Sequence, residues 1–504
     1  SRVLFKGEIT ALEPEFGEGT QAVLAVRGYD RSHRLHRGTF SKTYQNMTDS
    51  DVASTIARDA GLRAQVDATT EVYEHILQRN QSHMEFLAER ARRIGFEFFV
   101  EDRTLHFRRP QQASDELELE WGRQLRTFRP RLTLAEQVDK VIVKGWDVKN
   151  RRAISGEAQR GEAEPQTGHQ QSGGQMASAA FSRATRTVVD LNVASQAEAH
   201  ALAQAICDEL SGALIEAEGL CYGTPELRAG RWVRLTSLGR QFSGTYLVTS
   251  ATHIYRAEAE YVTTFYIHGR RAETLFSLLE ASAQRSANMA GPAIALVTSN
   301  NDPEGWGRVK VKFPWLADDV ESAWARVASV GAGDGRGVQW LPEVNDEVLV
   351  VFENGDANRP YVIGGLWNGQ HKPPLPVSEA VAGGDVHKRV LKTRAGHMLT
   401  FIDGSGEGVT LETKGGHKVT LADEDKRVVV ETSGGLKLTL DDGKSEIVID
   451  SGGNLSLKSG ANMTIEATGT LELKGQTFSL KGTARGEVDG GAALDVKGGL
   501  VRIN

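Results

Sequence analysis

The sequence predicts a mainly β protein of several domains: duplicated β-barrels with a few helices, then a small closed barrel, then a C-terminal β-prism. Three observations lead to this fold class. A chain of 504 residues is too long for a single core. Its apolar residues alternate mostly in short runs bounded by turn formers. From Leu399 to Ile503, apolar residues recur in pairs two positions apart, once every seven to ten residues.

The composition is that of a folded globular protein. Charged residues make up 25% and hydrophobic residues 39% of the chain, and no apolar run is long enough to span a bilayer. The net charge of −7 is spread over interleaved acids and bases, which argues against a nucleic-acid-binding face. Only Cys207 and Cys221 occur, so we expect no disulfide framework, synthesis in a reducing compartment, and a buried Cys207 on a helix.

Two segments of the N-terminal half resemble each other. LAVRGYDRSHR (Leu24–Arg34) and VIVKGWDVKNRR (Val141–Arg152) share a strand-like run that ends in Val, a base, Gly, an aromatic residue and Asp. A capped amphipathic helix follows each echo, one at 49–61 and one from Ser195, where Glu198 completes a capping-box pattern. Internal duplication of a β-domain explains the echo.

The stretch between the echoes has its own local signals. Ser82 and Glu85 form a capping box ahead of an amphipathic helix, and FEFFV with TLHF predicts a hairpin around Asp102. The start, SRVLFKGEIT, resembles neither a signal peptide nor a natural initiator, so we expect residues to be missing there. The expected domains are a first barrel (1–47), a helical and hairpin insertion (48–121), and a second barrel (122–285) with a long exposed loop (156–174).

Residues 286–375 are expected to form a small closed barrel. Five or six short strands, among them GRVKVKFPW and EVLVVFENGD, occur without a substantial helix, which is typical of an OB-type barrel. The Pro-rich HKPPLP (His371–Pro376) then predicts a stiff joint.

Residues 376–504 contain the paired apolar residues, which we call teeth. Residues i and i+2 of a strand face the same way, so each tooth is one short strand with two inward side chains. A single-chain solenoid needs roughly twenty residues per rung, so three chains are needed to close a triangular prism. A monomeric β-roll and an aggregation-prone tail are the alternatives, although the GGxGxD repeat of calcium-binding rolls is absent. The expected trimer core comprises Val409, Leu411, Val419, Leu421, Val428, Val430, Leu438, Leu440, Ile447, Ile449, Leu455, Leu457, Met463, Ile465, Leu471 and Leu473.

Catalytic and metal sites are not expected. His33 and His36 lie three apart without an acidic or Cys cluster, which favours a basic loop over a metal pair. Glu343, Asp346 and Glu347 lie in a turn that offers no cleft for a glycosidase pair. HExxH, G-x-S-x-G and P-loop motifs are absent. We therefore expect a protein that is not an enzyme and has no cofactor, no catalytic residues and no metal site.

The order of these parts resembles a known family. NQSHMEFLAERARRIGFEFF and YDRSHRLHRGTF resemble the hub region of VgrG-like spike proteins and phage late-control D proteins. DPEGWGRVKVKFPWLADD and GVQWLPEVNDEVLVVFENGDANRPYVIGGLWNG are similar to that family's OB domain, and the resemblance covers nearly the whole chain. It implies a structural spike of hub barrels, OB collar and trimeric needle at the end of the inner tube of a contractile injection machine. Such a spike adapts a six-fold tube to a three-fold needle and pierces the target envelope.

The resemblance also implies partners and a location. The partners are two further copies of the chain, inner-tube and baseplate proteins and effector cargo, with no nucleic acid and with a membrane met only by mechanical puncture. The protein would be made and assembled in the bacterial cytoplasm, within a phage-tail-like particle that is released from the cell. No His follows His417, and about forty residues separate Gly365 from Val409, so a metal-bound His tip and an inserted lysozyme are not expected.

Two other functions stay open. One is a cell-wall or polysaccharide-degrading β-solenoid enzyme, which requires clustered acids or bases on one outward face. The other is an OB-fold nucleic-acid binder, for which Lys310 and Lys312 alternate on one strand but no aromatic stacking platform is evident beside them.

The C-terminal tip is expected to bind a separate cap. A triangular prism ends in open strand edges, here around Leu500, Val501 and Ile503, and open edges invite unwanted pairing. We expect a small protein resembling the family's conical PAAR-repeat proteins to cover them.

Overall fold

The computed structural model describes residues 3–20, 22–111, 117–162, 164–269, 291–317 and 320–503. The chain divides into two compact units, Ser1–His371 and Lys372–Asn504, and each is described by itself. Strands outnumber helices in both units, which confirms the mainly β class. The expected boundary between residues 285 and 286 lies outside the described residues. Below, "hub" means the described residues up to 269, "OB domain" residues 291–371, and "needle segment" residues 388–503.

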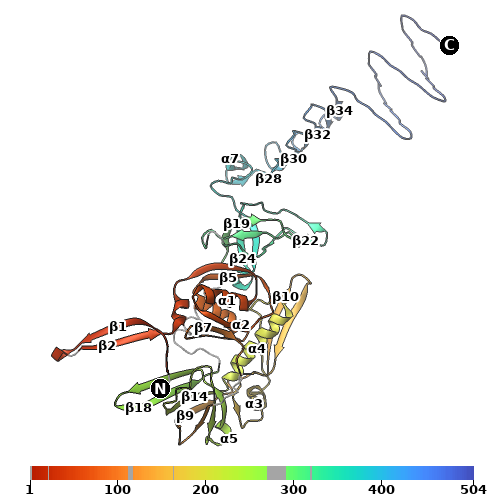
Figure 1. The fold of residues 1–504 in the computed structure, drawn as a ribbon. Coiled ribbons are helices and arrows are strands. Elements are labelled where there is room, and N and C mark those ends of the chain that lie inside the picture. Colours follow the sequence, from red (N-terminus) through yellow and green to blue (C-terminus); the bar gives the residue numbers. More distant parts are fainter. Residues whose placement is uncertain are drawn as a thin grey trace. The chain divides into compact units, whose positions relative to one another are not determined.

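The chain begins with a two-stranded antiparallel hairpin, which we call the arm. Among the described residues, strands β1 (Glu8–Phe16) and β2 (Ala22–Tyr29) pair only with each other, and they project from the rest of the hub (Figure 1). Of the barrel expected in residues 1–47, the described residues form this hairpin and strand β3 (Phe40–Met47). Strand β3 pairs with β5 (Tyr73–Gln81), across the expected boundary at 47/48.

The first hub core joins both sides of that expected boundary. Leu35 and Tyr44 are buried together with Val52, Ile56 and Phe107, so residues before and after 47 share one core and the boundary predicted there is wrong. Capping boxes are present at the N-termini of the two helices of this core, α1 (Asp49–Asp59) and α2 (His83–Arg93). The predicted hairpin around Asp102 is confirmed. The other elements of this core are η2 (Arg31–His36), β4 (Arg63–Val66), β6 (Glu97–Glu101) and β7 (Thr104–Arg108).

A second hub core is enclosed by two four-stranded sheets. Their strand orders are β12-β16-β15-β8 and β17-β18-β14-β9, and Tyr246 and Phe265 are fully buried between them. The strands are β8 (Leu117–Glu120), β9 (Leu125–Leu132), β12 (Gln166–Thr167), β14 (Ile215–Tyr222), β15 (Trp232–Thr236), β16 (Gly244–Leu247), β17 (Ser250–Arg256) and β18 (Ala259–Ile267). The short helix α5 (Gly239–Phe242) precedes β16.

A third hub core lies between helix α4 (Gln196–Gly212) and a three-stranded sheet of β10 (Lys140–Asp147), β11 (Arg152–Ala158) and β13 (Thr185–Val188). Ser195 caps α4 as predicted, but only half of the capping box forms. The Glu198 carboxylate accepts a hydrogen bond from the Ala194 N–H, not from Ser195. Its other oxygen binds Arg93 of α2, so a tertiary contact replaces the local one.

The long exposed loop predicted at 156–174 is shorter than expected: the irregular, mostly exposed or half-exposed stretch lies between residues 159 and 172 and, among its described residues, is interrupted only by the two-residue strand β12. Strand β11 runs to Ala158, and helix α3 (Gly173–Ala180) begins after a capping box at Ser172. Gly156 and Gly161 are packed closely against α4. A Cβ at Gly156 would collide with the Ala199 backbone, and one at Gly161 would collide with Ser211 Oγ. These glycines allow close packing and do not mark a solvated loop.

The OB domain has a five-stranded sheet in the order β20-β19-β24-β25-β21 around a core of Val, Ala and Phe side chains. The predicted OB-type barrel is thus built from these strands. They are β19 (Ala293–Ser299), β20 (Lys310–Lys312), β21 (Arg326–Val327), β24 (Glu347–Phe352) and β25 (Pro360–Gly365), with η3 (Glu353–Gly355) and the small hairpin β22 (Ala332–Gly333) and β23 (Arg336–Gly337) outside the sheet.

The second unit is dominated by a seven-stranded antiparallel meander in which every strand pairs with its neighbour in sequence. Its strands are β28 (Lys388–Lys392), β29 (Met398–Ile402), β30 (Gly408–Glu412), β31 (Lys418–Ala422), β32 (Arg427–Glu431), β33 (Lys437–Asp441) and β34 (Glu446–Asp450). Before it lie α7 (Val377–Ala380), β26 (Val381–Ala382) and β27 (Asp385–Val386). Residues 451–503 form no strand within the single chain.

In the part of the chain that the structure describes, none of the helices has the length and apolar character required to cross a membrane.

Candidate functional site

The teeth of the needle segment form one continuous row across the meander. Val409 pairs with Leu421, and Leu411 pairs with Val419. The same pairing continues to β34, where Leu438 meets Ile449 and Leu440 meets Ile447. Because side chains directly opposite in neighbouring strands lie on the same face, the teeth share a face from β29 to β34.

This row is exposed in the single chain. Leu411, Leu421 and Ile449 each expose between 44% and 53% of their surface. The following teeth, including Ile465 and Leu473, are also exposed, at 61% and 65%. A contiguous apolar row of this length marks an interaction surface, because covering its half-exposed side chains would gain roughly 25 cal/mol for each Å² of apolar surface removed from water.

The spacing of the teeth changes along the needle segment. Strands β29 to β34 begin nine or ten residues apart, and four- or five-residue turns join them. The eight-residue pitch begins only after Ile449, where the described chain has no intrachain pairing. On the opposite face of the meander, Thr400, Thr410 and Thr420 are aligned opposite one another. This alignment of threonines was not foreseen, although a Thr between the two apolar residues of each of these teeth was a readable signal.

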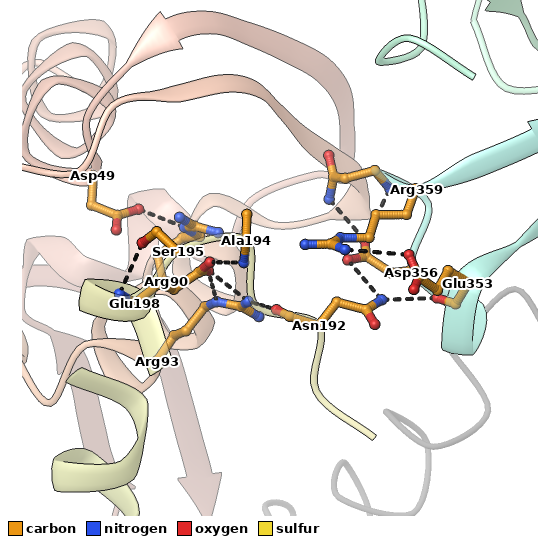
Figure 2. Close-up of polar contacts among 11 residues, drawn as sticks. Asp49, Arg90, Arg93, Asn192, Ala194, Ser195, Glu198, Glu353, Asp356 and Arg359 are labelled. Carbon is orange, nitrogen blue, oxygen red and sulfur yellow. Dashed lines mark hydrogen bonds and ion pairs between the residues drawn. The ribbon is translucent and has the colours of Figure 1, made fainter. Parts of the chain in front are cut away.

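In the hub, buried ion pairs join three helices (Figure 2). Arg90 Nε of α2 donates to Asp49 Oδ1 of α1 at 2.5 Å, and both groups are almost wholly buried. The Arg90 guanidinium also lies over the Tyr73 ring, 4.4 Å from its centroid. Arg93, one helical turn further on, binds Glu198 of α4 at 2.7 Å. These pairs fix how α1, α2 and α4 are oriented, because a misplaced helix would leave a buried charge without a partner.

The hub meets the OB domain at a seam of side-chain-to-backbone hydrogen bonds. His75 Nε2 lies 2.8 Å from the Glu321 carbonyl oxygen, and the Leu77 N–H donates to Asn358 Oδ1 at 2.8 Å. Asn192, whose carbonyl accepts from Arg93, donates to the Glu353 carbonyl at 2.9 Å (Figure 2). The buried hub network is thus continuous with the seam.

The pKa of His75 gives the seam a pH dependence. Burial lowers this pKa below its ordinary value of 6.5, against the opposing effect of the hydrogen bonds to Glu321 and Asn358. The unfolded chain therefore takes up this proton at a higher pH than the folded chain. The stability that neutral His75 contributes is complete above pH 6.5 and is lost as the pH falls below that value towards the lower pKa of the folded chain.

We therefore expect the thermal midpoint of the full chain to fall more steeply on acidification than that of His75→Gln, whose amide still donates to Glu321. The measurement is calorimetry at a series of pH values on either side of 6.5. His36→Gln, at an exposed position, is the matched control and should follow the wild type. Identical slopes for wild type and His75→Gln would contradict this assignment.

Several of the residues considered for catalysis and metal binding have structural partners. His33 Nε2 lies 2.7 Å from Glu8 Oε2, while His36 is exposed and Leu35 between them is buried. Hydrogen bonds from Arg34 and His33 lower the pKa of Glu8 to about 2. Asp346 accepts from the Glu343 N–H at 2.8 Å and so closes its own turn.

The two cysteines are buried, as expected for Cys207. Burial raises the pKa of the Cys207 thiol to about 11, so the reactive thiolate is strongly disfavoured at neutral pH.

The surroundings of strand β20, which carries Lys310 and Lys312, differ from expectation in one respect. Trp324 lies beside it, with Lys310 Nζ 5.4 Å and the Arg308 guanidinium 5.7 Å from its ring centroid. The sequence had suggested no aromatic residue there. Both cations already have partners, because Lys310 pairs with Glu321 and Arg308 forms two hydrogen bonds with Asp302.

Comparison with known proteins identifies the class. Residues 293–367 match the type VI secretion system/phage-baseplate injector OB domain. A stretch of 97 residues, 18% of this chain, is 37% identical to the type VI secretion system spike protein VgrG2a of Pseudomonas aeruginosa. A stretch of 143 residues, 25% of this chain, is 32% identical to the actin cross-linking toxin VgrG1 of Vibrio cholerae. In these stretches the chain is similar to VgrG spike proteins and to the injector OB domain.

The particular family follows from the N-terminal half. Residues 1–256 match the Alg8 N-terminal domain, and the chain belongs to that family. The matched stretches span only 12% of the length of each of the two curated relatives. Among solved structures, an Escherichia coli type VI secretion component, described as similar to the T4 bacteriophage tail proteins gp27 and gp5, aligns at 17% identity with a TM-score of 0.45. That alignment covers 71% of this chain and 82% of the other.

Proposed function

We propose that the protein is the structural spike of a contractile injection machine. Three copies form a hub and a needle at the end of the inner tube, adapt the six-fold tube to the three-fold needle, and pierce the target envelope. The observation that carries this proposal is the single-face row of exposed teeth, which needs two further copies to be covered. The injector OB domain and the family of the N-terminal half support the same function.

The two other functions are less well supported. A β-solenoid enzyme needs clustered like charges on an outward face, whereas acids and bases of the needle segment pair with each other, as Lys474 does with Glu472 at 2.6 Å. A nucleic-acid-binding OB face needs free cations, whereas Lys310, one of the two lysines considered, pairs with Glu321, and the neighbouring Arg308 pairs with Asp302. We therefore propose a function without catalysis, with the needle meeting a membrane only by mechanical puncture.

The location and remaining partners follow from the proposed machine. The chain would be made and assembled in the bacterial cytoplasm, next to inner-tube and baseplate proteins, and would travel with effector cargo in a phage-tail-like particle released from the cell. Electron microscopy of native particles, with this chain labelled, tests the proposal. Label confined to one end of a tube with a contractile sheath is expected, and label absent from such particles would contradict it.

A cap on the tip is the finer part of the proposal. Leu500 and Ile503 expose 72% and 92% of their surface, and we propose that a partner resembling PAAR-repeat proteins covers them. Deleting the residues from Leu500 onward is expected to abolish capping and to leave the trimer intact, because most teeth remain. Pull-down of a co-expressed candidate tip protein by full-length and truncated spike measures this. Retention of the cap by the truncated spike would contradict the assignment of the interface.

A further inference from the structure

The turns of the meander form two rows, one along each end of its strands. One row consists of the turns at 393–397, 413–417 and 432–436, and the other consists of the turns at 403–407, 423–426 and 442–445. Successive turns alternate between the two sides of the sheet, because every strand is antiparallel to its neighbour in sequence. We call the first the basic row and the second the acidic row, from the charges that they carry.

The two rows carry opposite charges. The basic row contains Arg394, Lys414, two histidines and no acidic residue, which gives a formal charge of +2. The acidic row contains six acidic residues and only two bases, Lys426 and Lys444, which gives a formal charge of −4. All of these charged side chains are exposed. The six acids are Asp403, Glu407, Asp423, Glu424, Asp425 and Asp442.

Hydrogen bonds between turns order the backbone of both rows. In the basic row, backbone N–H groups of the second and third turns donate to Nδ1 of His397 and of His417, each at 3.4 Å. In the acidic row, the Gly406 N–H donates to Glu424 Oε2 of the next turn at 2.5 Å. Each turn is thus tied to its neighbour in the row. This order lowers the entropy cost of association, because less of the backbone has to be fixed when a partner binds.

Charges of both signs stay uncompensated within the chain. In the acidic row, Asp425 pairs locally with Arg427 at 2.7 Å. By contrast, Glu407 and Asp423 of that row, and Lys414 of the basic row, form no ion pair with any residue that the structure describes. A partner for one row must be basic, and a partner for the other must be acidic. A second copy of this chain supplies both.

We infer that the basic row of one copy lies along the acidic row of the next copy in the trimer. This rests on the proposed trimeric function, in which each copy supplies one wall of the prism and its two rows reach two different corners. Around a three-fold axis every contact is head-to-tail, so each corner joins one row of each kind and three identical contacts close the ring. A two-fold pair would instead bring like rows together, where the acidic charges repel. The rows therefore favour three-fold closure.

Cross-linking of the purified full-length protein tests the inference. The double variant Lys414→Cys with Asp423→Cys places one thiol in each row, and native Cys207 and Cys221 are buried, which keeps background reaction low. A short bis-maleimide is expected to shift this variant from one chain to three on a denaturing gel. Each single variant is the matched control and should stay at the mass of one chain, because like rows lie at different corners. A cross-link within one chain does not raise the mass.

The outcomes distinguish this inference from the proposed function. Arg394→Cys with Glu407→Cys carries the same test one turn earlier in each row, should the first double variant not fold. Cross-linking of either single variant into larger species overturns the inference, because like rows then meet. A trimer confirmed by light scattering in which neither double variant is cross-linked also overturns it and leaves the spike function standing. A stable folded monomer would overturn both.

Discussion

Replacing both Ile465 and Leu473 by Asp is expected to abolish assembly of the needle. In the proposed prism each substitution brings three carboxylates together at an apolar axis. Burying an ion costs several kcal/mol, and the repulsion between like charges adds to that cost. Light scattering of the wild type should give three chains of 54.8 kDa, and the variant should lose this mass or its heat stability.

The control for this variant lies between the teeth. Thr464 is adjacent to Ile465 in the sequence and faces the opposite way in a strand, so Thr464→Asp should place its charge in solvent and preserve the trimer. If the Ile465→Asp and Leu473→Asp double variant stayed trimeric and heat-stable, these side chains would not face the axis. A wild-type protein that scattered as a stable monomer would refute the prism altogether.

The second large effect is expected in the hub at Asp49. Asp49→Ala leaves the Arg90 guanidinium, 12% exposed, buried without its partner. Removing one member of a buried ion pair costs about 3–5 kcal/mol. The hub unfolding transition, followed by calorimetry on the full chain, should move to clearly lower temperature.

Two further variants locate the cause of that loss. Asp59→Ala removes an exposed carboxylate of the same helix, close to Lys42, and should change stability by less than about 1 kcal/mol. The double variant Asp49→Leu with Arg90→Met should recover much of the lost stability, because replacing a whole buried pair by apolar groups is often tolerated. If Asp49→Ala unfolded like the wild type, the pair would not be stabilising the orientation of these helices.

Local sequence signals predicted the parts of the fold that depend on neighbouring residues. The capping box at Ser82 and Glu85 and the hairpin at Asp102 were both readable, because their partners lie within a few positions. The capping box predicted at Ser195 was only half confirmed. Its Glu198 is recruited by Arg93, 105 residues away, and no local pattern announces that contact.

Packing between distant segments accounts for the other differences. The glycines between 156 and 174 were interpreted as loop residues, whereas Gly156 and Gly161 allow backbone to approach α4. The domain boundary predicted at residues 47/48 was wrong because β3 pairs with β5, which lies after helix α1 in the sequence. In the needle segment, the alternation of apolar residues indicated which side chains share a face, but a single chain does not reveal which surface covers them. The trimer core therefore stays a prediction.

The pairing of every meander strand with its sequence neighbour has a consequence for folding. Closing each strand pair from β28 to β34 fixes only a turn of four or five residues, so this stretch has very low contact order and needs no second chain to begin folding. Residues 451–503 have no such intrachain partner and must wait for other copies. Assembly kinetics should thus divide into a fast, concentration-independent phase in the meander and a slower phase beyond Asp450 that accelerates as the protein concentration rises.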